Sequence, residues 1–171
     1  MERNPAFLKK GRAKNALKGF TLVELAVVVG IILLFSVLIF PNFKSGRKNL
    51  ALLRSASKLS QDIRRAQNMA MSSKGSFGIK IDKNSSNYIL FIDSNNDHIY
   101  NISEEIELLV LEEDITVSGL FPDFSPLNIT FSPPDPVTNF NPDSSTISIV
   151  ISNGEKQKTI FVNKAGLIYA Q

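Results

Sequence analysis

The sequence predicts an α+β protein, in which one long N-terminal helix is followed by antiparallel strands that pack on the C-terminal half of the helix. An apolar run extends from Phe20 to Phe40, an apolar stripe at helical spacing continues beyond it, and after residue 72 the hydrophobic period changes to two. We therefore divide the chain into segments 1–19, 20–40, 41–72 and 73–171. At 171 residues, it has room for about one modest domain beside the apolar helix.

The first segment, 1–19, is basic. Six basic residues and one acidic residue precede Gly19, so this segment holds a net +5, while the whole chain has +3 and the remainder −2. Positive charge next to an apolar run holds that end of the chain on the cytoplasmic side of a membrane. The overall basicity is therefore no argument for a nucleic-acid partner.

The second segment, Phe20 to Phe40, contains one charged residue, Glu24. As a helix, its 21 residues would rise about 31 Å, which is enough to cross a bilayer core. Pro41 follows directly and is expected to kink the helix at the membrane exit. A carboxylate within an apolar run is costly unless it is paired, so Glu24 is expected either to meet an amine or to extend to the lipid headgroups.

The third segment, 41–72, is predicted to continue the helix as an amphipathic one. Apolar residues recur at spacings of four and three, which indicates a face that packs against the rest of the domain: Leu52, Ala56, Leu59, Ile63, Ala66 and Ala70. Basic residues on the opposite face are expected to be solvated: Lys48, Arg54, Lys58, Arg64 and Arg65.

The fourth segment, 73–171, is predicted to be rich in β-strands. Alternating or β-branched runs occur at 77–81, 88–92, 106–111, 115–117, 129–131, 147–151, 159–162 and 167–169. Asn153-Gly154 predicts a hairpin turn, since both residues tolerate positive φ. Six of the eight prolines lie between Phe121 and Pro142, which predicts a long irregular loop with one short strand in it.

A polar loop after the second predicted strand has the spacing of calcium ligands. Oxygen-bearing side chains occupy the first, third, fifth and twelfth positions, at Asp93, Asn95, Asp97 and Glu104. His98 stands where the sharp turn of a calcium loop needs glycine, and strands are expected on both sides, so a polar turn is favoured over a metal site. No cofactor is expected. The chain has no cysteine and no recognisable catalytic motif, which indicates a non-enzymatic role.

The junction between the first two segments carries the strongest motif, Lys18-Gly19-Phe20-Thr21-Leu22-Val23-Glu24-Leu25. It resembles the processing signal of type IV pilins and type II secretion pseudopilins. The resemblance implies that prepilin peptidase cuts between Gly19 and Phe20 and methylates the new amino group of Phe20. It also implies that Glu24 offsets the N-terminal amine of a neighbouring subunit during assembly.

Weaker matches extend over the rest of the chain. The segments 64–67, 88–93, 129–133 and 164–168 are similar to those of pseudopilin H and FimT-type minor pilins, which implies a helix packed on two antiparallel sheets. DNA-uptake relatives tend to place arginines after the glycine that corresponds to Gly166, whereas this chain has Leu167-Ile168-Tyr169. From Lys44 onward there are 13 basic and 14 acidic residues, which gives no broad attraction for phosphates and argues against DNA as a partner.

The sequence thus predicts a structural, minor subunit of a type IV pilus or a type II secretion pseudopilus. It would be held in the bacterial inner membrane by one helix, with its N-terminus in the cytoplasm and its β-rich domain outside, until it joins other pilin subunits in a filament. Two alternatives stay open: a competence-type minor pilin that binds DNA, and a single-pass anchored domain that is never processed.

Overall fold

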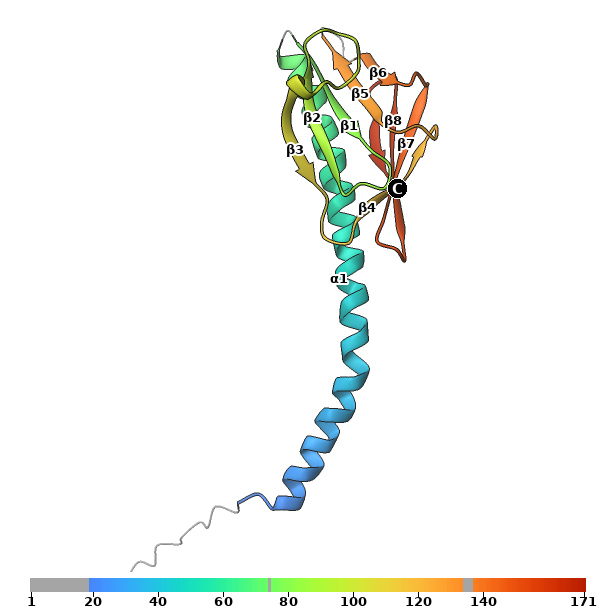
Figure 1. Ribbon diagram of the computed structural model, residues 1–171. Helices are drawn as coiled ribbons and strands as arrows, with labels where there is room; N and C mark the ends of the chain where they lie inside the picture. Colours follow the sequence, from blue (N-terminus) through green and yellow to red (C-terminus); the bar gives the residue numbers. More distant parts are fainter. Residues whose placement is uncertain (1–18, 74, 134–136) are drawn as a thin grey trace, which may run out of the picture. The chain divides into compact units, whose positions relative to one another are not determined.

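The computed structural model describes residues 19–73, 75–133 and 137–171, without the side chains of residues 37–44. One α-helix is followed by nine strands and one short 3-10 helix (Figure 1). The helix is α1 (Leu22–Ser72) and the 3-10 helix is η1 (Ile102–Glu104). The strands are β1 (Ser76–Ile81), β2 (Asn87–Asp93), β3 (Glu105–Val110), β4 (Thr116–Phe121), β5 (Leu127–Ser132), β6 (Val137–Asn141), β7 (Thr146–Ser152), β8 (Gln157–Asn163) and β9 (Ile168–Ala170).

The chain forms two compact units, one ending at Pro41 and one beginning at Asn42. The backbone of α1 runs through both, and the predicted kink at Pro41 stays a prediction. Within the part of the chain that the structure describes, no helix is long and apolar enough to cross a membrane. The expected membrane span from Phe20 to Phe40 is therefore not confirmed, and its last residues are among those whose side chains are not described.

The second unit contains two antiparallel sheets. The first has the strand order β3-β2-β1-β5-β6 and the second has the order β4-β7-β8-β9. Every paired strand is antiparallel to its neighbour. The expectation of an α+β domain with a helix followed by antiparallel strands is confirmed.

The predicted apolar stripe of α1 is buried in one core with both sheets. Leu59, Ile63, Ala66 and Ala70 are fully buried, and Leu52 and Ala56 nearly so. Strand residues at every second position join them, among them Ile79 from the first sheet and Ile149 from the second. Period-two alternation in the strands and period-3.6 spacing in the helix thus bury their apolar faces against each other.

The basic face of α1 is exposed, as expected, but several of its residues also bind strands. Lys58 Nζ donates to the carbonyl oxygen of Val110 at 2.7 Å, and Arg65 pairs with Glu107 at 2.8 Å. These contacts fasten the helix to β3, the edge strand of the first sheet.

The proline-rich stretch is more ordered than predicted. The expectation of one short strand was wrong, because both β5 and β6 lie within it and β4 extends into its start. Thr138 and Phe140 of β6 are buried while their neighbours are not, so β6 has a core face. It is an edge strand, where nearby prolines are tolerated because one side of the strand needs no hydrogen bonds from the sheet.

The Asn153-Gly154 hairpin joins β7 to β8, as predicted. Only Gly154 has positive φ, at 86°. Asn153 contributes through its side chain, whose Oδ1 accepts the amides of Glu155 and Lys156. The turn thus depends on the side-chain oxygen of Asn153 and on the backbone freedom of Gly154.

Candidate assembly site at the start of the helix

The predicted cleavage junction lies just before the first turn of α1. Lys18 and the rest of the basic leader lie outside the described residues, whereas Gly19 and Phe20 are described and exposed. A Cβ added at Gly19 would meet no atom within 4 Å. The backbone at this junction is therefore open to an approaching protein.

Thr21 caps the helix. Its Oγ1 accepts the backbone amide of Glu24 at 3.2 Å, and its carbonyl oxygen accepts the amide of Leu25 at 3.1 Å. Sequence reasoning missed this role, although Thr-x-x-Glu is the pattern of an N-terminal capping box. The cap explains why the helix begins at Leu22, directly after the junction.

Glu24 lies in the first turn of α1. Unpaired amides give a helix N-terminus a partial positive charge, which stabilises a carboxylate there. Among the described residues, no cation forms an ion pair with Glu24. The side chain of Glu24 is therefore exposed at the helix start, without a cationic partner among the described residues.

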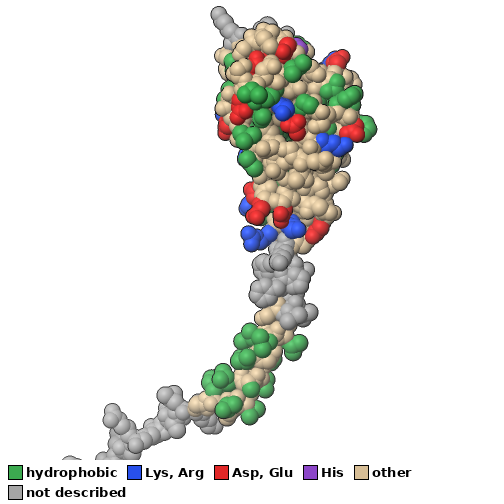
Figure 2. Space-filling model, viewed as in Figure 1, with side chains coloured by type: hydrophobic (Ala, Val, Ile, Leu, Met, Phe, Trp, Pro, Cys, Tyr) green, Lys and Arg blue, Asp and Glu red, His purple; other side chains and the backbone are tan. Residues whose placement is uncertain are grey.

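Around Glu24, the start of α1 exposes apolar side chains on all sides. Every residue from 19 to 35 is exposed, including Phe20 (82%), Leu22 (84%) and Leu34 (70%). Figure 2 shows hydrophobic side chains in green along the described part of the helix start. An exposed apolar surface of this extent marks a site that lipid or other protein covers.

The polar loop from Asp93 to Glu104 uses its oxygens to fix its own backbone. Asp93 is buried and accepts the amides of Asp97 and His98 at 3.1 and 3.2 Å. Glu104 accepts the amides of Ser94 and Asn101 at 2.9 and 3.1 Å. These two side chains accept backbone hydrogen bonds within the loop, as in a polar turn.

The two other candidate ligands of this loop, Asn95 and Asp97, also bond within it. Asn95 and Asp97 bond to each other at 2.8 Å, and the pKa of Asp97 is lowered chiefly by the hydrogen bond that its carboxylate accepts from the amide of Ile99. Within the described ranges, no group of three or more acidic or histidine side chains could hold a metal ion. These contacts are those of a polar turn, and the preference for a turn over a calcium site at Asp93, Asn95, Asp97 and Glu104 stays a prediction.

The same loop covers the outer face of the first sheet. Tyr100 packs edge-on against Phe91 with ring centroids 5.6 Å apart, and Lys80 lies over the Tyr100 ring at 5.3 Å. His98, which has positive φ, places Nδ1 2.9 Å from the hydroxyl of Thr130. This explains why Phe91 is fully buried although it faces away from the helix.

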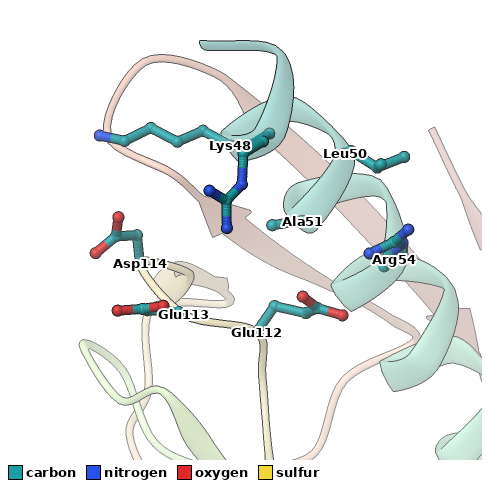
Figure 3. Close-up of a pocket in the computed structure, with 8 residues that line it drawn as sticks. Lys48, Leu50, Ala51, Arg54, Glu112, Glu113 and Asp114 are labelled. Carbon is teal, nitrogen blue, oxygen red and sulfur yellow. The ribbon is translucent and has the colours of Figure 1, made fainter. Parts of the chain in front are cut away.

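A groove of about 500 Å³ lies between α1 and the connection from β3 to β4. Figure 3 shows Lys48 and Arg54 on the helix side and Glu112, Glu113 and Asp114 on the opposite side. None of the ion pairs among the described residues joins these two groups. Sequence reasoning missed the groove, because the acidic run gives no sign of which helix residues it faces.

Two sequence segments singled out above meet at the C-terminal end of the chain. Arg64 donates to the carbonyl oxygen of Ile168, and Gln67 Nε2 donates to that of Gly166 at 3.2 Å. Gly166 has a φ of 76°, which suits glycine and turns the chain from β8 into β9. The segments 64–67 and 164–168 thus fasten the last strand to the helix.

Comparisons with known proteins identify the fold. Two crystal forms of the type IV minor pilin FimU from Pseudomonas aeruginosa PAO1 superpose with TM-scores of 0.52 and 0.53, at 15% and 16% identity. Each comparison covers 70% of this chain, and 92% or 87% of the FimU chain. No protein-family profile and no curated protein sequence matches. The chain therefore has a pilin-like fold.

Proposed function

We propose that this chain is a structural, minor subunit of a type IV pilus or a type II secretion pseudopilus, which assembles through the N-terminal half of α1. The observation that carries the proposal is the pilin-like fold together with an exposed apolar helix start that holds one carboxylate, Glu24. The exposed apolar surface of a helix is stabilised when it is buried, and packing against the corresponding helices of other subunits would bury it.

In this proposal, prepilin peptidase cuts between Gly19 and Phe20 and methylates Phe20. Cleavage there creates a positively charged amine four residues before Glu24. Glu24 belongs to the first helical turn, and among the described residues no cation pairs with it. A neighbouring subunit can supply the missing partner to each charge, so pairing between chains would fix the axial register.

Before assembly, the segment from Phe20 to Phe40 would hold the chain in the bacterial inner membrane. Its composition supports this, since one charged residue in 21 is tolerable in lipid. The basic leader would keep the N-terminus in the cytoplasm and place the β-rich unit on the other side.

The described surface gives no support for DNA capture. The residues from Lys44 onward are nearly balanced in charge. Lys58 and Arg64 already bond to backbone carbonyls, and Arg65 is paired with Glu107. Binding to the phosphate backbone needs several cations on one surface, and the groove cations Lys48 and Arg54 face the acidic run Glu112 to Asp114.

The test is the intact mass of the protein extracted from cells with and without prepilin peptidase. We expect a product that starts at methylated Phe20 only where the peptidase is present. Gly19→Val should block cleavage, because a branched side chain obstructs the approach to the backbone. Gly30→Val is the matched control, since Gly30 also has no atom within 4 Å of an added Cβ. An intact leader in both strains would show an unprocessed anchored domain instead.

A further inference from the structure

Three aromatic residues lie in one row across the outer face of the second sheet. In the strand registers, Phe121 of β4 pairs with Ser148 of β7, Ser148 pairs with Phe161 of β8, and Phe161 pairs with Tyr169 of β9. The row therefore crosses all four strands. Its members point away from the core, because the strand residues that precede them, Leu120, Ile147, Ile160 and Ile168, are buried in it.

Two of the three rings in this row contact each other. Phe161 and Tyr169 stack with centroids 5.1 Å apart and an angle of 19° between their planes. Phe121 and Tyr169 are 71% and 48% exposed. Two strand spacings separate Phe121 from Phe161, about 10 Å, with only the small side chain of Ser148 between them. The row thus places Phe121 on one side of Ser148 and the stacked pair of Phe161 and Tyr169 on the other.

The other outward-facing strand residues of this face are uncharged, and most are polar. They are Thr116, Gly119, Thr146, Val150, Ser152, Gln157, Thr159 and Asn163. Within the described part of the chain, the side chains of Thr146, Ser148, Gln157 and Thr159 make no hydrogen bond to other protein groups. Four side chains that can donate and accept therefore surround the aromatic row.

We propose that this face binds an uncharged polysaccharide. A sugar ring presents C–H groups that carry partial positive charge on its faces, and these pack against the negative face of an aromatic ring. Its hydroxyl groups point outward around the ring, where unused hydroxyl and amide groups of Thr146, Ser148 and Gln157 can bond to them. The absence of charge on this face matches a neutral chain and disfavours phosphates, nucleic acids and anionic lipids.

This inference goes beyond assembly, because the face lies in the second unit and does not involve the start of α1. It suits a surface-exposed subunit that meets extracellular or cell-wall glycans. It holds whether or not the chain is processed, so its failure would leave the cleavage experiment unaffected.

The test uses the full chain in a detergent without a sugar headgroup, such as dodecyldimethylamine oxide. Retardation is measured in native gels that contain increasing amounts of amylose, dextran or a soluble β-1,4-glucan. We expect at least one of these glucans to retard the protein to the same extent at low and high salt, since no ion pair is involved. Phe121→Ser and Tyr169→Ser should each weaken this binding about tenfold, which is the upper range for one ring contact.

Leu108→Ser is the matched control. Leu108 is a large apolar residue, 52% exposed, on the edge strand of the other sheet, and its replacement should leave retardation unchanged. Thermal unfolding of all three variants checks that each is folded. Binding to none of the glucans would overturn the proposal. Binding that Phe121→Ser and Tyr169→Ser both retain would overturn it too. Concentration-dependent association of the protein that Phe121→Ser abolishes would also overturn it, because the face would then bind a second copy.

Discussion

The phenol of Tyr88 on β2 donates a hydrogen bond to the carboxylate of Asp62 on α1. Tyr88 is 2% exposed and belongs to the core that joins the helix to the first sheet. Burial, followed by the bond to Asp62, raises the pKa of Tyr88 well above its usual value of 10. This pair therefore fixes the first sheet to the helix through a hydrogen bond that needs a neutral phenol.

The first prediction concerns alkaline pH. A folded-state pKa above the unfolded value means that stability is fully present below pH 10 and is lost as the pH rises beyond it. We expect the free energy of unfolding to fall by up to about 1.4 kcal/mol per pH unit above pH 10 on account of this group. Tyr88→Phe should remove that part of the slope, and cost about 1.5–3 kcal/mol at neutral pH because a bond to a charged acceptor is lost. Urea unfolding followed by circular dichroism measures both effects, and an equal alkaline slope in the two proteins would contradict the prediction.

The second prediction concerns close packing inside the first sheet. A Cβ at Gly78 would lie 2.7 Å from the carbonyl oxygen of Ile129 and 2.7 Å from Cζ of Phe91. Gly78→Ala should therefore destabilise the protein by about 1–3 kcal/mol, because the backbone of β5 cannot yield as a flexible side chain can. Gly119→Ala in β4 is the control, since its Cβ would meet Val150 at an ordinary 3.6 Å. Thermal unfolding compares the two variants, and equal midpoints would show that β1 and β5 separate easily.

The third prediction concerns calcium. If the loop were a calcium site, calcium at ten times its dissociation constant would stabilise the protein by about 1.4 kcal/mol. We expect no shift of the unfolding midpoint on adding calcium or a chelator, because the loop carboxylates bond to backbone amides. Asp93→Asn should still destabilise the loop by about 1–3 kcal/mol, as one of its buried acceptors becomes a donor. A midpoint that rises with calcium in the wild type but not in Asp93→Asn would show that the loop binds calcium.

Most of the fold could be predicted because its signals are local. The stripe from Leu52 to Ala70 has helical spacing over five turns, and the core face of each long strand alternates with period two. The strand β6 was missed because its short alternation, Thr138 and Phe140, is hidden among prolines that normally indicate a loop. β6 is a strand because it pairs with β5, and a local sequence pattern does not show which segment pairs with which.

The candidate site could be predicted only in part. Glu24 was singled out because a charge in an apolar run is conspicuous, whereas the cap by Thr21 appears only once the helix start is known. The spacing from Asp93 to Glu104 suits calcium ligands as well as a polar turn, and only the folded loop shows that Asp93 and Glu104 accept backbone amides. The aromatic row could not be predicted from the sequence, because Phe121, Phe161 and Tyr169 become neighbours only through strand register.

The last prediction concerns assembly and rests on the proposed function. Glu24→Gln keeps the size and the first helical turn but removes the charge, so cleavage before Phe20 should continue while the chain fails to enter filaments. The reason is that each N-terminal amine would enter an apolar surrounding without a counter-charge, which costs several kcal/mol. Thr21→Val is the matched control: it removes the cap, costs about 1 kcal/mol of helix stability, and should reduce incorporation only slightly. The measurement is the amount of processed protein in filaments sheared from cells, relative to the amount left in the membrane. Normal incorporation of Glu24→Gln would mean that the exposed apolar surface of α1 suffices for assembly, and that the carboxylate serves only the start of its own helix.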